Sequence, residues 1–217
     1  MVMDDLLDAV RGVCEEGQRR QSPASDGLRE IVRALDVLDA PRPCEAEDLP
    51  VVRAHLGRSL SLASDPVARR LADAMLANAA VIPWRASRSY AGDPRVVDFL
   101  RSYAVAPIVG PDRYGSRWPY YSDRVMFGMT LQAPDLHYQA HAHTAVEIYY
   151  VIGGTVDWQQ GDGLWRRLAP GDFVLHQSEE PHAMRTLADP LLALFAWVSD
   201  LDSEPRIVDP PCEPQPV

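Results

Sequence analysis

Cysteine is scarce in this 217-residue chain, and its three copies follow no metal-binding or disulfide spacing. Cys14, Cys44 and Cys212 are far apart, include no CxxC pair, and are odd in number. Neither a disulfide framework nor a zinc knuckle is therefore indicated. A reducing compartment is the simplest expectation.

Basic residues are also few relative to acidic ones. The chain has 21 Lys and Arg against 31 Asp and Glu, a formal net charge of −10, and no segment gathers basic residues. Nucleic acids and anionic membranes attract clustered positive charge, so we expect neither as a partner. A small molecule is the expected partner, and a homodimer is compatible with these features.

Long apolar runs are missing too. No segment approaches the roughly 20 apolar residues of a membrane span, and Asp4 and Asp5 stand where a secretory signal would carry positive charge. No repeat at solenoid spacing is visible. These features predict a cytoplasmic protein of one moderate domain with an added segment, or of two small domains.

The amino-terminal part has the pattern of amphipathic helices. From Met3 to about Ala80 apolar residues recur at helical spacing, which predicts three or four helices. Breaks are expected at 21–27 and in the proline-rich stretch 40–50, and Pro66 suits the first turn of a helix. We assign residues 1–85 to a helical region.

The rest of the chain has short β-type runs separated by Gly, Pro and Asp, beginning at about Ile82. We predict an antiparallel β-barrel over 86–203. The segment 204–217 is too rich in proline to join the centre of a sheet, so it is expected to form a tail.

One stretch carries the chemistry, HYQAHAHTAVEIYYVIGG, residues 137–154. Alternate side chains of a strand share a face, so His141, His143, Glu147 and Tyr149 should point to one side. Burying these polar groups among Val, Ile and Ala costs free energy unless they gain partners. Two imidazoles and a carboxylate suit a divalent transition metal, which would offset that cost.

A fourth ligand should come from another strand. His182 is the candidate, because it follows a Gly-Asp turn, a short apolar run and a second turn in APGDFVLHQSEEPHAMRT. A single histidine is more often a core or surface group than a metal ligand. We therefore assign His55, which lies on a predicted helix, to the core or the surface. The joint arrangement favours a site of three histidines and one glutamate.

The spacing HxH, three residues, Glu, six residues, Gly resembles the first motif of the cupin family, and it is met by His141, His143, Glu147 and Gly154. The resemblance implies a double-stranded β-helix barrel with its metal near the open mouth, so the fold class is mainly β with an α-helical amino-terminal region. Cupins carry many reactions, so the fold alone does not decide the function.

The second cupin motif is matched in part by PGDFVLHQSEEPH, residues 170–182. Gln177, Glu179 and Thr186 stand where proline, glycine and asparagine are usual. These departures concern the geometry of the turn and strand, and they leave the predicted ligand set intact.

Tyr149 narrows the choice, because a phenol beside a metal can act as a general base. HxHxxxExY, with Tyr138 before it and EPHAM later, resembles the cupin dimethylsulfoniopropionate (DMSP) lyases that have a helical amino-terminal region. That resemblance implies one divalent metal (Zn, Fe(II) or Mn) and β-elimination to dimethyl sulfide and acrylate. The implied residues are the metal ligands His141, His143, Glu147 and His182, the base Tyr149, and Tyr138 and Trp197 in the substrate pocket.

Such a substrate has a carboxylate and a sulfonium, and a sulfonium is best held by aromatic faces. The candidates are Tyr138, Tyr150, Trp158, Phe195 and Trp197. Parity places Tyr150 on the outer face, and Tyr138 can reach the pocket only if the strand bends or bulges near Gln139.

Other residues receive weaker assignments. His137 and His176 are expected at the surface or supporting the ligands. The aromatic stretch 118–124 is read as either a lid or a packing cluster, and Arg185 as a partner of the substrate carboxylate or of Glu179 or Glu180.

Two other functions remain open on the sequence. One is a cupin dioxygenase or isomerase that uses iron or manganese at the same ligands. The other is a non-catalytic small-molecule-binding cupin acting as a sensor, which is less favoured because no basic DNA-binding helix is visible and such a protein would not need Tyr149.

Overall fold

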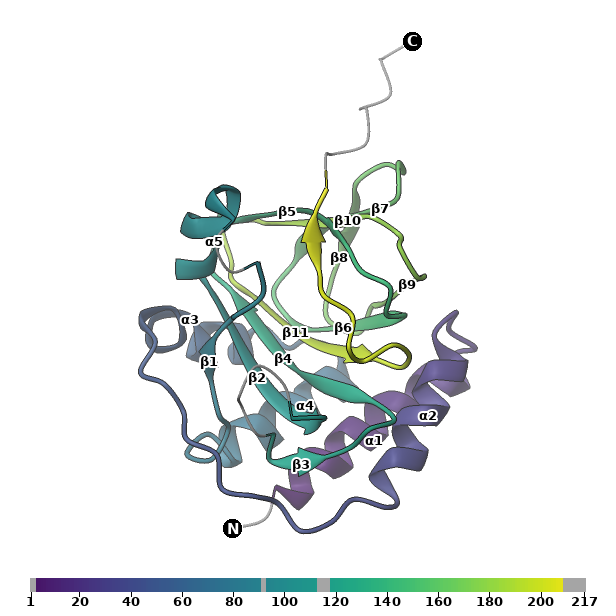
Figure 1. The fold of residues 1–217 in the computed structure, drawn as a ribbon. Helices are drawn as coiled ribbons and strands as arrows, with labels where there is room; N and C mark the ends of the chain where they lie inside the picture. Colours follow the sequence, from purple (N-terminus) through teal and green to yellow (C-terminus); the bar gives the residue numbers. More distant parts are fainter. Residues whose placement is uncertain (1–2, 91–92, 113–117, 209–217) are drawn as a thin grey trace.

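The computed structural model describes residues 3–90, 93–112 and 118–208. Cys212 and most of the expected tail lie outside these ranges. The described chain forms two sheets, antiparallel except where the short strand β3 pairs with β2 in parallel, with a layer of helices against one of them (Figure 1). Among these residues no helix combines the length and the apolarity needed to cross a membrane.

Four helices form the amino-terminal layer, as the apolar periodicity predicts: α1 (Asp4–Arg19), α2 (Ser25–Leu35), α3 (Pro50–Ser61) and α4 (Pro66–Ala77). Helices α3 and α4 contact the strands of the larger sheet, and α1 packs on α2 and α4. Pro66 occupies the first helical position of α4, as expected, where its missing N–H removes no helical hydrogen bond.

The larger sheet has the order β1-β2-β4-β11-β6-β9, and β3 pairs with β2. Its strands are β1 (Arg85–Ala86), β2 (Tyr103–Gly110), β3 (Tyr120–Tyr121), β4 (Met126–Gln132), β6 (Glu147–Gly153), β9 (Phe173–His176) and β11 (Leu191–Trp197). The second sheet has the order β12-β5-β10-β7-β8. Its strands are β5 (His137–Ala142), β7 (Val156–Gln160), β8 (Arg166–Leu168), β10 (His182–Thr186) and β12 (Arg206–Ile207).

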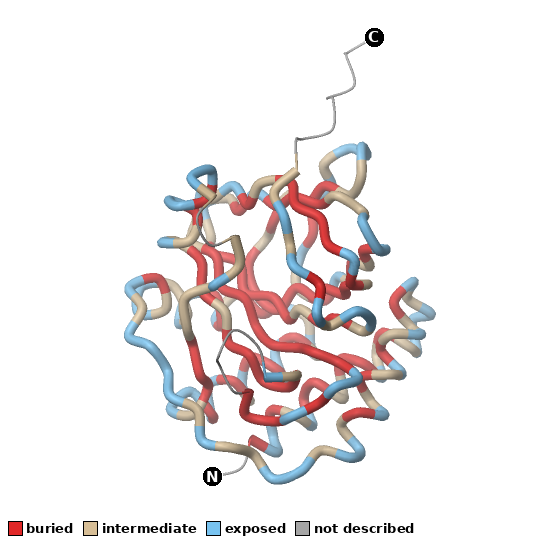
Figure 2. The backbone as a smooth tube through the Cα atoms, viewed as in Figure 1, coloured by how far each residue is buried: buried red, intermediate tan, exposed pale blue. Residues whose placement is uncertain are grey.

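Strands β4 to β11 divide equally between the two sheets, with the hairpin β7-β8 in the second sheet, in the order of a double-sheet jelly roll. This confirms the predicted cupin barrel. Buried backbone continues through both sheets, whereas exposed backbone follows the outer sides of the helices and the long connection between α2 and α3 (Figure 2).

The boundaries expected at 85 and 203 fall beside short strands, β1 and β12. Strand β12 pairs with β5 at the edge of its sheet, and a 3-10 turn (η1, Pro94–Val96) and the short helix α5 (Val97–Arg101) precede β2. Because the helices and the outer face of the larger sheet share one hydrophobic core, the division into separate regions stays a prediction.

Alternate side chains of strand β6 point into two different hydrophobic cores. Ile148, Tyr150 and Ile152 belong to the core shared with the helices. Tyr149 and Val151 belong to the interior core of the barrel. The outward direction predicted for Tyr150 is therefore confirmed.

Strand β5 has the irregularity that Tyr138 requires. Its pairing with β10 matches His141 to His182 but Tyr138 to Met184, so β5 has one extra residue between the two pairs. This bulge brings the rings of Tyr138 and His141 into a stack, with centroids 4.0 Å apart and planes 7° apart. The bulge predicted near Gln139 is confirmed.

Asp65 joins the helical layer to the barrel. Its carboxylate accepts hydrogen bonds from the N–H groups of Val67 (2.9 Å) and Ala68 (3.1 Å), which caps α4. The Tyr150 hydroxyl also donates to it at 3.2 Å, and Arg20 lies at 3.3 Å. Burial acts to raise the pKa of Asp65, but these contacts outweigh it and hold the pKa below its usual value.

Replacing Asp65 with alanine should lower the free energy of unfolding by about 1–2 kcal/mol at pH 7, mainly by removing the cap. Since the native pKa is lowered, the stabilisation is present above the unfolded pKa of about 4 and is lost as the pH falls through the native pKa. The difference between variant and wild type should therefore shrink in acid. Urea unfolding followed by circular dichroism at several pH values measures this, with exposed Asp73→Ala on α4 as the control. An equal loss in both variants would contradict the capping role.

Candidate metal centre

An open cavity of about 130 Å³ enters the barrel. It is lined by the ligand candidates His141, His143 and Glu147, by aromatic side chains, and by residues of the β1 segment. The aromatic lining consists of Tyr103, Trp118, Tyr138, Tyr149, Phe195 and Trp197, and the β1 segment contributes Arg85, Ala86, Ser87, Arg88 and Ser89. The cavity thus combines a polar cluster, aromatic faces and positive charge.

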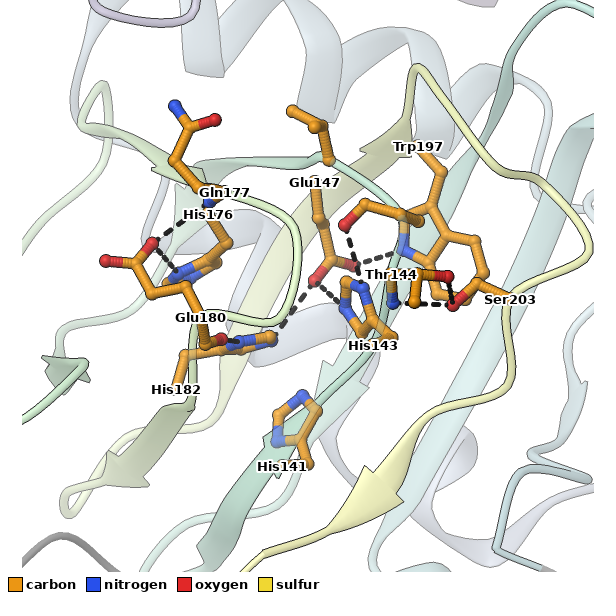
Figure 3. Close-up of polar contacts among 12 residues, drawn as sticks. His141, His143, Thr144, Glu147, His176, Gln177, Glu180, His182, Trp197 and Ser203 are labelled. Atoms are coloured by element: carbon orange, nitrogen blue, oxygen red, sulfur yellow. Dashed lines mark hydrogen bonds and ion pairs between the residues drawn. The ribbon is translucent and has the colours of Figure 1, made fainter.

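Three of the predicted ligands converge. His143, directly after β5, Glu147 on β6 and His182 on β10 are all buried, and one ligand atom from each lies within 4.8 Å of the others. The Oε2 atom of Glu147 lies 3.0 Å from His143 Nε2 and 3.2 Å from His182 Nε2. Figure 3 shows both imidazoles directed at this carboxylate.

The histidines are held in one tautomer by the backbone. Their Nδ1 atoms lie 2.9–3.0 Å from carbonyl oxygens, of Gln139 for His141, of Ala145 for His143 and of Glu180 for His182. A carbonyl oxygen only accepts, so each Nδ1 donates its proton and the Nε2 of a neutral ring carries a lone pair. This is the orientation that metal-binding histidines adopt.

His182 gives the clearest indication of a cation. Its Nε2 is buried and has no hydrogen-bond partner among the described residues, although Glu147 Oε2 is 3.2 Å away. A lone pair facing a carboxylate oxygen is unfavourable unless a proton or a cation lies between them. The donor set of two imidazoles and a carboxylate suits a divalent transition metal.

His141 lies beside this cluster and is not one of the three converging residues. Its ring is buried, stacks on Tyr138, and has its centroid 4.0 Å from that of His182. Burial and the neighbouring His182 hold the pKa of His141 well below its usual value, so the ring is neutral. Direct ligation by His141 stays a prediction.

Glu147 is the negative centre of the cluster. Burial acts to raise its pKa, but His143 and His182 outweigh burial and hold the pKa well below the usual value. In His143, burial acts to lower the pKa, and the carboxylate of Glu147 outweighs it and raises the pKa. A buried carboxylate that stays ionised is a suitable cation ligand.

Trp197 has two contacts in the site. Its indole N–H donates to Glu147 Oε1 at 2.8 Å, and its ring lies against His143 with centroids 4.6 Å apart (Figure 3). It also lines the cavity. The pocket position predicted for Trp197 thus comes with a second role, orienting the glutamate, which the sequence does not indicate.

Tyr149 lies deeper along the same face of β6 and lines the cavity with Glu147. Its ring centroid is 4.8 Å from that of Trp158 and 6.2 Å from that of His176. Burial and the charge of Glu147 raise the pKa of Tyr149 well above its usual value. The phenol therefore keeps its proton unless positive charge joins the site.

The aromatic candidates fall into two groups. Tyr138, Phe195 and Trp197 line the cavity, and the Tyr138 hydroxyl lies 2.6 Å from that of Tyr90. Tyr150 and Trp158 are fully buried elsewhere. Strand alternation in the sequence therefore identifies only some of the aromatic residues that line the cavity.

The supporting histidines differ in position. His137 is exposed. His176 is fully buried, accepts a hydrogen bond from Trp158 Nε1 at 3.0 Å, and stacks on His182 with centroids 3.8 Å apart. His176 thus fixes the ring of a predicted ligand. Arg185 lies over the Trp165 ring at 4.0 Å, and among the described residues it has no ion pair with the acidic side chains considered for it.

Several cavity residues were not predicted from the sequence, and the two that carry charge are Arg85 and Arg88. They lie at the end of a segment without helical or strand periodicity. The pairing of β1 with β2, Arg85 with Val105 and Ala86 with Ala104, brings this segment to the larger sheet beside the cavity. Trp118 of the aromatic stretch 118–124 lines the cavity as well.

The motif positions keep their backbone geometry despite the substitutions. Gly154 has φ +88°, and a Cβ there would lie 2.1 Å from the Pro190 carbonyl oxygen, so glycine is required. Glu179, at the usual glycine of the second motif, adopts φ +65°, in the left-handed region. Its N–H donates to the His143 carbonyl at 2.8 Å, so the turn still holds the ligand loop.

Comparison with known proteins identifies one family. The profile of the dimethylsulfoniopropionate lyase family matches residues 25–193. The DMSP lyase DddQ of Ruegeria pomeroyi is 32% identical over 166 residues, which is 74% of this chain and 79% of the relative. The putative DMSP lyase DddL of Cereibacter sphaeroides is 30% identical over 187 residues, 85% of this chain and 72% of the relative.

Solved structures agree with these relatives. The crystal structure of DddQ from Ruegeria pomeroyi superposes with a TM-score of 0.67 at 29% identity, covering 92% of this chain and 96% of that one. A structure from a study of the DMSP lyases RdDddP and RnDddQII superposes with a TM-score of 0.74 at 27% identity, covering 95% and 97%. Helices and barrel are thus both shared with these proteins.

Proposed function

The chain belongs to the dimethylsulfoniopropionate lyase family, and on that basis we propose that it is a metal-dependent enzyme that cleaves DMSP to dimethyl sulfide and acrylate. The observation that carries the metal is the convergence of His143, Glu147 and His182, with the Nε2 of His182 facing a carboxylate oxygen. Tyr149, on the same face of β6 as Glu147, lies in the same cavity and is the proposed base.

The chemistry of the substrate fits the lining. DMSP carries a carboxylate and a sulfonium on a three-carbon chain, and its elimination begins with loss of the proton α to the carboxylate. A divalent cation bound by His143, Glu147 and His182, with His141 as a further predicted ligand, would supply Lewis-acid stabilisation of negative charge on the carboxylate.

The chain's own residues then handle the proton and the leaving group. Positive charge in the site would lower the pKa of Tyr149. Its phenolate oxygen would then take the α proton as the carbon–carbon double bond forms and the carbon–sulfur electron pair leaves with dimethyl sulfide. Trp197 holds Glu147 in place through its N–H.

Aromatic faces suit the other end of the substrate. A sulfonium carries positive charge and accepts no ordinary hydrogen bond, so it is attracted to ring faces by about 0.5–2 kcal/mol per ring. We assign this role to Tyr138 and Trp197, with Phe195 beside them in the lining.

The test is an assay of the purified protein. After removal of bound metal and reloading with Zn, Fe(II) or Mn separately, dimethyl sulfide released from millimolar DMSP is measured in the headspace. We expect release with at least one metal and none in the chelated sample. No release with any metal, together with oxygen consumption on another substrate, would replace the lyase by a dioxygenase.

Trp197→Phe should weaken metal binding by about 10- to 100-fold, because it removes the hydrogen bond that orients Glu147 while keeping an aromatic ring. Competition titration with a chromogenic chelator measures the affinity. Trp165→Phe, outside the cavity lining, is the matched control. Unchanged affinity in the Trp197 variant would show that the hydrogen bond does not support the ligand.

A further inference from the structure

Arg85 brings a positive charge to the wall of the cavity. It is the first residue of β1, and pairing with Val105 of β2 places it at the end of the larger sheet, where it lines the cavity with Glu147 and Tyr149. Its side chain is partly buried. The guanidinium carbon lies 5.8 Å from the centroid of the buried Trp118 ring, within cation–π range.

Within the described ranges, no carboxylate forms an ion pair with the Arg85 guanidinium. Over the described residues Arg85 makes no side-chain hydrogen bond and no ion pair, whereas Arg42 and Arg167 each hold a carboxylate. The charge of nearby Glu47 acts to raise the pKa of Arg85, but no ion pair joins the two side chains, and the Glu47 carboxylate accepts from the Ala86 N–H at 3.0 Å. The five N–H donors of Arg85 are thus available to a ligand.

The surroundings make a positive charge at this position costly unless an anion accompanies it. The side chain is partly buried, and this burial lowers the pKa of Arg85. A partly desolvated cation that no protein carboxylate satisfies gains most from a bound anion. The contact with Trp118 is a cation–π contact at 5.8 Å, which uses none of the N–H donors in a hydrogen bond.

We propose that Arg85 is a specificity residue that binds the carboxylate of the substrate. This inference rests on the proposed function, because it assigns one end of DMSP to a residue of this cavity. A carboxylate has two oxygens and can be shared between an arginine and a cation. Exposed Arg88, which also lines the cavity, adds positive potential at this side of a chain with net charge −10.

A purely structural role makes a different prediction. If Arg85 only packs on Trp118, its replacement changes stability and leaves substrate affinity unaltered. If it binds the carboxylate, the loss is confined to ligands that carry one. The two roles are distinguished by comparing how the replacement changes the binding affinity of an anionic probe and of a cationic probe.

The experiment compares Arg85→Gln, Arg85→Lys and wild type, with Arg69→Gln on the exposed face of α4 as a control for the loss of one positive charge. We expect the KM for DMSP to rise about 10- to 100-fold in Arg85→Gln, with a smaller change in kcat. Lysine should restore only part of the affinity, because it lacks the paired planar donors. An unchanged KM in Arg85→Gln overturns the inference.

Binding experiments keep this test separate from the proposed function. By calorimetry, acrylate should bind wild type and lose about 10-fold or more affinity in Arg85→Gln, while trimethylsulfonium, which has no carboxylate, should bind both equally. If the variant loses affinity for both probes equally, its fold is damaged, and the proposed role of Arg85 in binding the carboxylate is overturned. If the wild type releases no dimethyl sulfide, the proposed function fails, yet a selective loss of acrylate binding still supports Arg85 as the carboxylate site.

Discussion

Replacing Tyr149 with phenylalanine should reduce the release of dimethyl sulfide by about 100- to 10,000-fold, the usual contribution of a general base. The change removes a single oxygen from a buried ring, so the packing against Trp158 is kept. Metal content should be unchanged, because the convergent ligands are His143, Glu147 and His182. Headspace analysis of dimethyl sulfide and metal analysis of the same sample measure both quantities.

Tyr150→Phe is the matched control. It removes the same atom from the next residue, whose hydroxyl faces the helices and donates to Asp65. It should lose some stability and keep its activity per folded molecule. If Tyr149→Phe turns over DMSP at the wild-type rate, another group takes the proton and the base assignment is wrong.

Replacing Glu147 with glutamine should remove both bound metal and activity. The amide is nearly the same shape as the carboxylate but has no charge to balance a cation, and one of its two oxygen ligand positions becomes an N–H₂ donor. We expect metal affinity to fall by more than the roughly 10- to 100-fold of a lost supporting contact. Activity measured without added metal should fall to background.

Elemental analysis after dialysis gives the metal content, and activity is then followed as Zn, Fe(II) or Mn is added back. Glu15→Gln on the exposed face of α1 controls for the change of charge. A Glu147→Gln protein that keeps one metal per chain through dialysis, and remains active, would place the ion elsewhere. The same series on wild type identifies the metal that supports turnover, which this type of ligand set does not determine by itself.

Much of the ligand set could be predicted because it depends on local rules. Glu147 and Tyr149 share a face, and Tyr150 takes the other, since a strand alternates its side chains. The need for a bulge before His141 followed from the same rule, applied to Tyr138. The helices of the amino-terminal region followed from apolar spacing.

Other features of the site depend on contacts between distant segments. The indole of Trp197 reaches Glu147 because β11 pairs with β6 in one register. His176 supports His182 from a strand of the other sheet. No spacing along the chain encodes these pairings, so the sequence indicated aromatic and histidine residues there without their partners.

The sequence by itself determined the chemistry available to this protein: the ligand types, the phenol beside them and the barrel whose alternation directs them inward. Only the tertiary structure decided which groups meet, bringing together three of the four predicted ligands and placing His141 against Tyr138. It also brought Arg85 to the cavity, from a segment with no periodic pattern. The physical reason is that alternation is a property of one strand, whereas convergence depends on the register between strands and on the packing that fixes it.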